Sequence, residues 1–375
     1  MSGNAPSVRQ KAKEYSSIKA RFAVSGTALA FFAVSVFEVF LSDPLFEVLR
    51  RYFFRPDIPY IVIFLVFCGL VLFPNRFFGS YRIDRKYGLS AMTAGAWLKD
   101  DLKASILNFL LSLALIVVFY FNISAFPGTW WIISFFAWAL FSLVFVFLYP
   151  KVILPLFFRY IPISSEELKA GIEELGEKSG IKIRDVCRID FSRKTKKANA
   201  AVIGVWKTAK VILADTLTDN FTSDEVFMVT AHELGHYGKR HVAKLLLFSF
   251  FLSFFGFWAV FEVSNFIVHI SGVPGLSDIR TLPVLFLLVY CFDLIALPLR
   301  NFFSQRLERQ ADSFALDVFP RPEVFISVME KLADMNLSDT DPPLLRKIFF
   351  NTHPAISERI NFARKKIELS SRAAL

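Results

Sequence analysis

GTWWIISFFAWALFSLVFVFLYPKVILPLFF, residues 128–158, is apolar over more than the length that one α-helix needs to cross a bilayer. A hydrocarbon core about 30 Å thick needs about 20 apolar residues in a helix. This stretch therefore predicts a membrane span. Pro150 and Pro155 lack the N–H that a helix interior uses, so we expect the span to tilt or kink near them.

The rest of the chain shares this character, because 54% of its 375 residues are hydrophobic and 16% are aromatic. A mean hydropathy of +0.47 is too apolar for a soluble chain of this length. Six runs are long and apolar enough to span a bilayer, at 22–41, 59–78, 104–123, 129–155, 242–268 and 282–300. The first exceeds the roughly 7–15 apolar residues of a signal peptide, so we interpret it as a permanent anchor. The predicted fold class is an α-helical multi-pass membrane protein.

Lys and Arg are concentrated in every second loop between these runs. Loops rich in Lys and Arg stay in the cytoplasm, so their positions predict how the chain is oriented in the membrane. The N-terminal arm and the loop after the second run carry Arg9, Lys11, Lys13, Lys19, Arg21, Arg76, Arg82, Arg85, Lys86, Lys99 and Lys103. The opposite loops carry only Arg50, Arg51, Arg55 and Arg280. Both termini and the polar segments 156–241 and 301–375 are therefore expected in the cytoplasm. Topology then explains the net charge of +10, so no nucleic acid partner is needed.

The polar segment between the fourth and fifth runs predicts a small α+β unit. Two helices begin with capping boxes, formed by Ser164 with Glu167 and by Thr222 with Glu225. The first should end at Gly180, and VCRIDFS (186–192) alternates like a strand. The β-rich runs 199–206 and 210–217 predict a hairpin. We expect the second helix to continue into the fifth span.

The second helix carries TAHELGHYGKRH, residues 230–241, in a chain with five histidines. On a helix, His232 and His236 lie one turn apart on the same face, so their ring nitrogens can converge on one Zn²⁺. Zinc makes water nucleophilic at neutral pH, and the adjacent Glu233 could take the proton of that water as a general base. The spacing thus supplies two ligands and a base. A histidine-bearing helix that only looks like such a site is the alternative.

A catalytic zinc needs a third protein ligand and one open position. The segment 301–317, NFFSQRLERQADSFALD, offers Glu308 as this ligand, with Asp312 one turn later on the same face. Asp312 could accept a hydrogen bond from a ligand imidazole and fix its tautomer. Spacing alone supports equally well a solvated face on which the two acids pair with Arg306 and Arg309.

Together these residues resemble the integral-membrane M48 metallopeptidases of the CAAX prenyl protease 1 (Ste24-type) group. The resemblance rests on HELGHYGKRH at 232–241, on N-x-x-S-x-x-x-E-x-x-A-D at 301–312, on THPAISERI at 352–360, on KYGLSAMTAGAWLKDDLK at 86–103, and on KANAAVIG…VILADTL between 197 and 217. Each motif is weak alone, and their combination is specific.

The resemblance implies a helical membrane barrel enclosing a chamber, to which the apolar runs would contribute about six spans, with a small α+β, gluzincin-like zinc-peptidase domain facing the cytoplasm. Carried over by position, His232, His236 and Glu308 would bind one zinc, and Glu233 would be the base. The other implied site residues are Asn199, which would hold substrate backbone, His353 and Arg359, which would stabilise the oxyanion, and Asn301 and Asp312, which would support the ligands.

Several of these assignments keep an alternative. His353 could be a buried structural histidine, and His241, which matches the extended motif, could be a surface residue at a helix end. The family usually has seven spans, and 42–58 is too charged to supply another, which leaves closure of the chamber open. The family also favours Arg where this chain has Gln305.

Asp293 lies inside the last apolar run. Ionisable groups are costly in lipid and normally face a bundle interior, water or a partner. We expect Asp293 to face the chamber, and pairing with Lys or backbone at a packed interface is the alternative.

The predicted function is a membrane zinc endopeptidase that cuts near the C-terminus of lipidated peptides. A general quality-control metalloprotease resembling the HtpX relatives would use the same residues, whereas a silent zinc-bearing scaffold would have no use for Glu233. The predicted partners are the bilayer and a peptide or protein substrate, for which the resemblance implies prenylation. A bacterial plasma membrane is favoured over the endoplasmic reticulum. We divide the chain into spans one to four at 1–158, a catalytic segment at 159–241, spans five and six at 242–300, and a C-terminal helical segment at 301–375.

Overall fold

The structure is a computed structural model that describes residues 7–205, 208–271 and 275–373. Within these ranges, six helical segments are long and apolar enough to cross a membrane, as the composition predicts. They are Val8–Tyr52, Asp57–Lys86, Ala94–Ala125, Trp130–Phe157, His241–Phe266 and Ile279–Val318. The segment 42–58 adds no separate span, because its helical part continues the first one.

The core of each span is one α-helix. These helices are α1 (Val8–Val36), α3 (Asp57–Arg76), α5 (Ala94–Ala125), α6 (Trp130–Leu148), α11 (His241–Ser271) and α12 (Leu282–Val318). Shorter pieces extend four of them, namely η1 (Phe37–Leu41), α2 (Ser42–Tyr52), η2 (Phe77–Arg82), α4 (Ile83–Lys86), η3 (Tyr149–Ile153), α7 (Leu154–Phe157) and η5 (Ile279–Thr281). The expected irregularity after α6 coincides with η3, a wide π-helical turn that contains Pro150.

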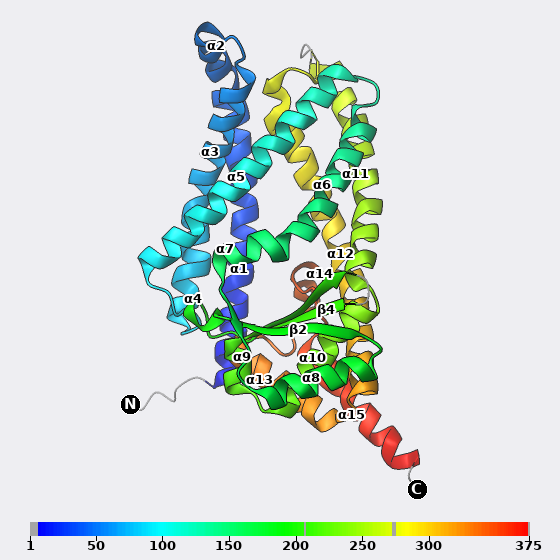
Figure 1. The fold of residues 1–375 in the computed structure, drawn as a ribbon. Helices are drawn as coiled ribbons and strands as arrows, with labels where there is room; N and C mark the ends of the chain where they lie inside the picture. Colours follow the sequence, from blue (N-terminus) through cyan, green and yellow to red (C-terminus); the bar gives the residue numbers. More distant parts are fainter. Residues whose placement is uncertain (1–6, 206–207, 272–274, 374–375) are drawn as a thin grey trace, which may run out of the picture.

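The six long helices form a closed ring of neighbours. In order, α1 packs against α3, α3 against α5, α5 against α6, α6 against α11, α11 against α12, and α12 against α1 (Figure 1). Six spans are therefore enough to close the ring.

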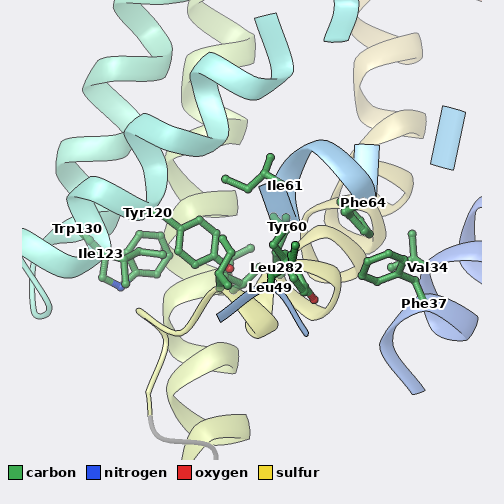
Figure 2. Close-up of a cluster of buried hydrophobic side chains, with 13 residues drawn as sticks. Val34, Phe37, Leu49, Tyr60, Ile61, Phe64, Tyr120, Ile123, Trp130 and Leu282 are labelled. Atoms are coloured by element: carbon green, nitrogen blue, oxygen red, sulfur yellow. The ribbon is translucent and has the colours of Figure 1, made fainter. Parts of the chain in front are cut away.

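Aromatic side chains join the ring at the end that carries α2 (Figure 2). The Phe37 ring lies 5.0 Å from that of Phe64 and 5.7 Å from that of Tyr60, both edge-to-face. Tyr60 Oη lies 2.7 Å from Ser42 Oγ, and Tyr120 Oη lies 2.9 Å from Thr281 Oγ1, so both buried hydroxyls are hydrogen-bonded. The pair Tyr120–Thr281 connects segments that are 161 residues apart in the sequence.

A four-stranded sheet lies at the other end of the ring, in the order β1-β2-β4-β3. The strands are β1 (Tyr160–Pro162), β2 (Lys182–Ile189), β3 (Ala200–Val205) and β4 (Thr208–Ala214). The predicted hairpin is confirmed, since β3 and β4 pair antiparallel with Ala200 opposite Leu213. The strand predicted at 186–192 begins earlier, at Lys182, and runs parallel to β4. Strand β3 is an edge of the sheet, and one of its sides has no partner strand among the described residues.

Helices α8 (Glu166–Lys178), α9 (Asp215–Asn220) and α10 (Ser223–Gly238) and the short turn η4 (Phe191–Arg193) complete this layer. The capping box of Thr222 and Glu225 is confirmed at the start of α10. The box predicted at Ser164 is wrong by one residue, because Ser165 is the N-cap and its side chain accepts from the Leu168 N–H. Gly180 follows α8 with φ 66°, as a helix-ending glycine should.

The prediction that the histidine helix continues into the fifth span is wrong. Helix α10 ends at Gly238, and α11 begins at His241 after Arg240, whose φ of 56° is left-handed. Gly238 packs so closely on Ile181 that a Cβ would lie 3.2 Å from its Cδ1. The packing of α10 on the sheet thus fixes the direction of its axis. The axis of α11, the fifth span, points in another direction, so the chain turns between the two helices.

The C-terminal part adds α13 (Pro322–Asn336), α14 (Leu344–Phe350) and α15 (Ile356–Ala373). On α15, Ile360 and Ala363 are buried in a cluster with Phe325, Val328 and Met329 of α13. Helix α15 therefore packs on α13.

Candidate active site

Close packing of α10 on α12 creates the site. Gly235, between the two motif histidines, has no side chain, and a Cβ there would lie 3.2 Å from the Ala311 backbone. Ala311 itself is fully buried. This small-residue contact lets the backbones approach, so the side chain of Glu308 reaches the histidines of the other helix.

His232, His236 and Glu308 meet at one point, with their ligand atoms within 4.8 Å of one another. The two Nε2 atoms are 3.1 Å apart, and each lies 3.3 Å from a Glu308 oxygen. Glu308 is 6% exposed, and its Oε2 has no hydrogen-bond partner among the described residues. Two imidazoles and one carboxylate with an open fourth side are the donor set of a catalytic zinc, so these residues fit the ion.

The ionisation of Glu308 agrees with this arrangement. Burial alone would raise the pKa of its carboxyl, but the imidazoles of His232 and His236 beside it hold that pKa well below the usual range. The solvated helix face that spacing alone allowed is therefore not what the structure shows for Glu308 or for Asp312, which is 1% exposed.

Asp312 contacts the Nδ1 side of the His232 ring, and Arg359 in turn holds Asp312. His232 Nδ1 lies 2.9 Å from Asp312 Oδ1, and Arg359 Nε donates to Asp312 Oδ2 at 2.9 Å. Burial raises the pKa of Asp312, but Arg359 and His232 outweigh it and bring the pKa to about 2. The ionised carboxylate keeps the proton of His232 on Nδ1 and leaves Nε2 free toward Glu308.

His236 has a corresponding partner in His241, which is 1% exposed and so is not a surface residue. The two Nδ1 atoms lie 3.0 Å apart, and His241 Nε2 lies 3.3 Å from Gln310 Oε1. A neutral imidazole has one N–H. When His236 presents Nε2 to a metal, its Nδ1–H donates to His241 Nδ1, and His241 Nε2–H donates to Gln310. The turn at Arg240 is what brings His241 back over His236.

A cleft of about 760 Å³ opens beside the three-residue cluster, and both His232 and Glu233 line it. Burial raises the pKa of Glu233, which suits a proton acceptor that works near neutral pH. His353 also lines the cleft, with Nε2 3.4 Å from Glu308 Oε1, and its side chain is 59% exposed. A buried structural histidine would not be so accessible.

Asn199 and Arg359 line the same cleft, whereas Asn301 and Gln305 do not. Asn301 is buried away from it and donates to the Ile348 carbonyl at 2.8 Å, which holds α14 on α12. Gln305, which replaces the favoured Arg, adds hydrogen bonds to the carbonyls of Lys347 and Asn351 in the same region. These two side chains position the loop that carries His353.

Asp293 lies apart from the cluster, within the ring. It lines a cavity of about 240 Å³ together with residues of α5, α6 and α11. Its Oδ1 is 2.7 Å from Arg300 Nη1, a partner that the sequence interpretation did not name. Arg300 is about two turns nearer the catalytic end of α12, after Pro298, and it reaches back along the helix.

Sequence reasoning missed several residues of the cleft. Tyr15 and Lys19 line it from α1, and Lys197 lines it from the segment before β3. Gln310, the partner of His241, was also missed. No motif marks Tyr15 or Lys19, because only the closed ring brings α1 to the catalytic layer.

Comparisons with known proteins agree with this architecture. Residues 162–367 match peptidase family M48, and residues 5–159 match the N-terminal family of CAAX prenyl proteases, described as having five membrane helices. Within residues 7–159 this chain has four candidate spans. The crystal structure of Ste24p from S. mikatae superimposes with a TM-score of 0.82 at 21% identity, over 95% of this chain and 89% of that one, which establishes the shared fold.

Two relatives are similar to the chain in sequence over most of its length. An uncharacterized metalloprotease of Bacillus subtilis, YhfN, is 28% identical over 96% of this chain and 86% of its own length. A CAAX prenyl protease 1 homolog of Oryza sativa is 30% identical over 77% of this chain and 68% of its own length. With its M48 match, its multi-pass fold and its two-histidine, one-glutamate cluster, the chain belongs to peptidase family M48, as a membrane metalloendopeptidase of the CAAX prenyl protease 1 group.

Proposed function

We propose that this chain is a zinc endopeptidase that cuts lipidated peptides near their C-terminus at the cytoplasmic face of a bacterial plasma membrane. The observation that carries the proposal is the convergence of His232, His236 and Glu308 at the wall of a cleft that His232 and Glu233 line. One zinc per chain would be held by the three converging residues. When bound, zinc supplies Lewis-acid polarisation of the substrate carbonyl and a water that is nucleophilic at neutral pH.

The residues of the chain perform the proton transfers. Glu233 takes a proton from the attacking water and passes it to the leaving amine, a role that its raised pKa favours. His353 is accessible in the cleft, so it can donate a hydrogen bond to the oxygen on which negative charge develops. Arg359 lines the cleft too, but its Nε is bound to Asp312, so we assign it chiefly to holding His232 through that carboxylate.

Asn199 is proposed to hold the substrate backbone. It lies at the start of the edge strand β3, and its side-chain oxygen accepts from the Ala200 N–H at 3.0 Å. Its side-chain amide nitrogen is a donor suited to a peptide carbonyl. An extended substrate laid along β3 would pass this amide beside Glu233.

The preference for lipidated peptides is supported by the relatives, which are named CAAX prenyl proteases. The cleft also opens at the end of the helix ring, where an apolar chain attached to a substrate could stay among apolar helices. A general quality-control protease would use the same catalytic residues without a need for the lipid.

The proposal also states which side of the membrane the catalytic end faces and where the catalytic segment begins. The described ends of the chain and the catalytic sheet lie at the same end of the ring (Figure 1), beside the basic loops that the positive-inside rule assigns to the cytoplasm. The Bacillus subtilis relative supports a bacterial membrane. A catalytic segment that starts near residue 159 is supported by the meeting of the two family matches there.

The test uses purified wild type, Glu233→Gln and Glu308→Ala with a farnesylated peptide and its unmodified twin. We expect wild type to contain zinc and to cut, Glu233→Gln to keep zinc without cutting, and Glu308→Ala to lose zinc. Faster cleavage of the farnesylated peptide supports the lipid preference, and equal cleavage favours a quality-control protease. Wild type that holds no zinc, or that holds zinc and cuts neither peptide, would overturn the proposal.

A further inference from the structure

A cationic cluster occupies one end of the cleft. Tyr15 and Lys19 of α1 and Lys197 before β3 all line it, and they surround one carboxylate, that of Asp84. Tyr15 Oη donates to Asp84 Oδ1 at 2.9 Å, and Lys19 Nζ lies 3.2 Å from the same oxygen. Lys197 Nζ donates to Tyr15 Oη at 3.0 Å and is 3.9 Å from Asp84 Oδ2.

The cluster carries an excess positive charge, because two ammonium groups share a single carboxylate. Among the described residues that line the cleft, the further cations Arg346 and Arg359 are matched by Asp339 at 3.0 Å and by Asp312 at 2.9 Å. Burial lowers the pKa of the Lys197 ammonium; Asp84 offsets part of this effect and Lys19 adds to it. An additional anion in the cleft would stabilise both ammonium groups, and each retains about a third of its side chain exposed, Lys19 35% and Lys197 32%.

The polarity of β3 indicates which part of a substrate reaches this cluster. Strand β3 runs from Ala200 to Val205, and its outer edge has no partner strand among the described residues. Lys197 precedes the strand, so the cluster lies at its N-terminal end. A peptide that pairs antiparallel with β3 has its own C-terminal end beside that point. A peptide that pairs parallel would bring an amino group there instead, next to two ammonium groups.

We propose that Lys197 and Lys19 form a binding site for the free C-terminal carboxylate of a substrate peptide that lies antiparallel along β3. The inference rests on the proposed peptidase function and adds the feature that selects the cleavage position. A carboxylate fixed at one end of the cleft sets how many residues separate the chain end from Glu233. The enzyme would then release a short C-terminal peptide of defined length, and a blocked or extended C-terminus would bind poorly.

The test compares two fluorogenic peptides that are identical except for a free acid or an amide at the C-terminus. For wild type we expect kcat/KM to be about 10-fold or more higher for the acid, the size of one charge-assisted hydrogen bond. Lys197→Met should remove this preference by lowering the rate on the acid alone. Lys197→Arg keeps the charge and should keep the preference.

Lys196→Met is the matched control, because Lys196 is the exposed neighbour of Lys197. It should leave the ratio of acid to amide unchanged. If Lys197→Met fails to fold, as judged by thermal melting, Lys19→Met is assayed by the same ratio. Equal rates on acid and amide in wild type, or an equal loss on both peptides in the methionine variant, would refute the inference.

Binding separates this inference from the proposed function. The anisotropy of the same two peptides is measured with zinc-loaded Glu233→Gln, which retains the cluster. If wild type cuts nothing but this variant still binds the acid about 10-fold more tightly, the peptidase proposal fails and the carboxylate site stands. If both are bound equally, the carboxylate site fails whatever the activity.

Discussion

Replacement of His241 should weaken metal binding although His241 is not itself a ligand. His236 Nδ1 lies 3.0 Å from His241 Nδ1, and His241 in turn lies 3.3 Å from Gln310 Oε1. His241→Leu removes the acceptor of the His236 Nδ1–H inside a site where His241 is 1% exposed. A buried donor without a partner costs about 1–3 kcal/mol, which corresponds to roughly 5- to 150-fold in affinity. Loss of such supporting hydrogen bonds typically costs about 10–100-fold in metal affinity.

The assay is zinc affinity by chelator competition, with thermal melting of the metal-free protein as the control for folding. His241→Asn is the matched variant, because its amide oxygen can occupy the place of the lost ring nitrogen and accept the same proton. We expect the leucine variant to bind zinc at least about 10-fold more weakly and the asparagine variant to lie close to wild type. Equal affinity in wild type and His241→Leu would show that the contact does not orient His236, and an equal loss in both variants would show that shape alone matters.

Three further predictions concern the helices and the metal. Gly235→Ala should destabilise the protein by about 1–3 kcal/mol and lower its zinc content, because the added Cβ would lie 3.2 Å from the Ala311 backbone and push α10 away from α12. Gly128→Ala is the control, because a Cβ at Gly128 has no neighbouring atom within 4 Å, and it should change neither quantity. Both variants are compared with wild type by denaturant melting and by metal analysis. Burial would raise the pKa of Glu225, but hydrogen bonds from Lys331, Ser327 and Thr222 outweigh it, so its pKa lies below the ordinary value. The ionised Glu225 carboxylate therefore stabilises the fold above its unfolded-state pKa, and this stabilisation is lost as pH falls through its lower folded-state pKa. The melting temperature of Glu225→Gln should fall less steeply than that of wild type between neutral and acid pH. Parallel melting-temperature curves for the two proteins would contradict this prediction. Chelation should abolish cleavage and zinc should restore it, while a chelated enzyme that keeps full activity would exclude a metal mechanism.

The sequence predicts those features that depend on local periodicity and on turn chemistry. Each of the six spans follows from an apolar run of about the length that a bilayer requires or more. The β3–β4 hairpin and the capping box at Thr222 follow from residues close together in the chain. Helix spacing also brings His232 and His236 to one face, whereas it leaves Glu308 open as a solvated acid, and Glu308 is assigned as the third ligand only through the resemblance.

Other features depend on contacts that local patterns do not contain. The parallel pairing of β2 with β4 joins strands on opposite sides of β3 in the sequence. The turn at Arg240 exists because α10 is held by the sheet and α11 by the ring, and no glycine or proline occupies the left-handed position. Tyr15 reaches the cleft because α1 closes the ring against α12, a consequence of packing among six helices.

The two sides of the metal cluster are attached to the membrane helices in different ways. Glu308 lies on α12, which continues without a break from Leu282 in the ring, past Pro298, to Val318. At 1.5 Å per residue, Glu308 is roughly 15 Å beyond that proline, so the ring sets its position directly. His232 and His236 lie on α10, which the turn at Arg240 separates from the fifth span. The sheet therefore positions the histidines and the ring positions the carboxylate, and only their packing at Gly235 completes the site. A fragment of residues 159–241 contains both histidines and Glu233 but not the third ligand, so it should bind zinc weakly and cut nothing.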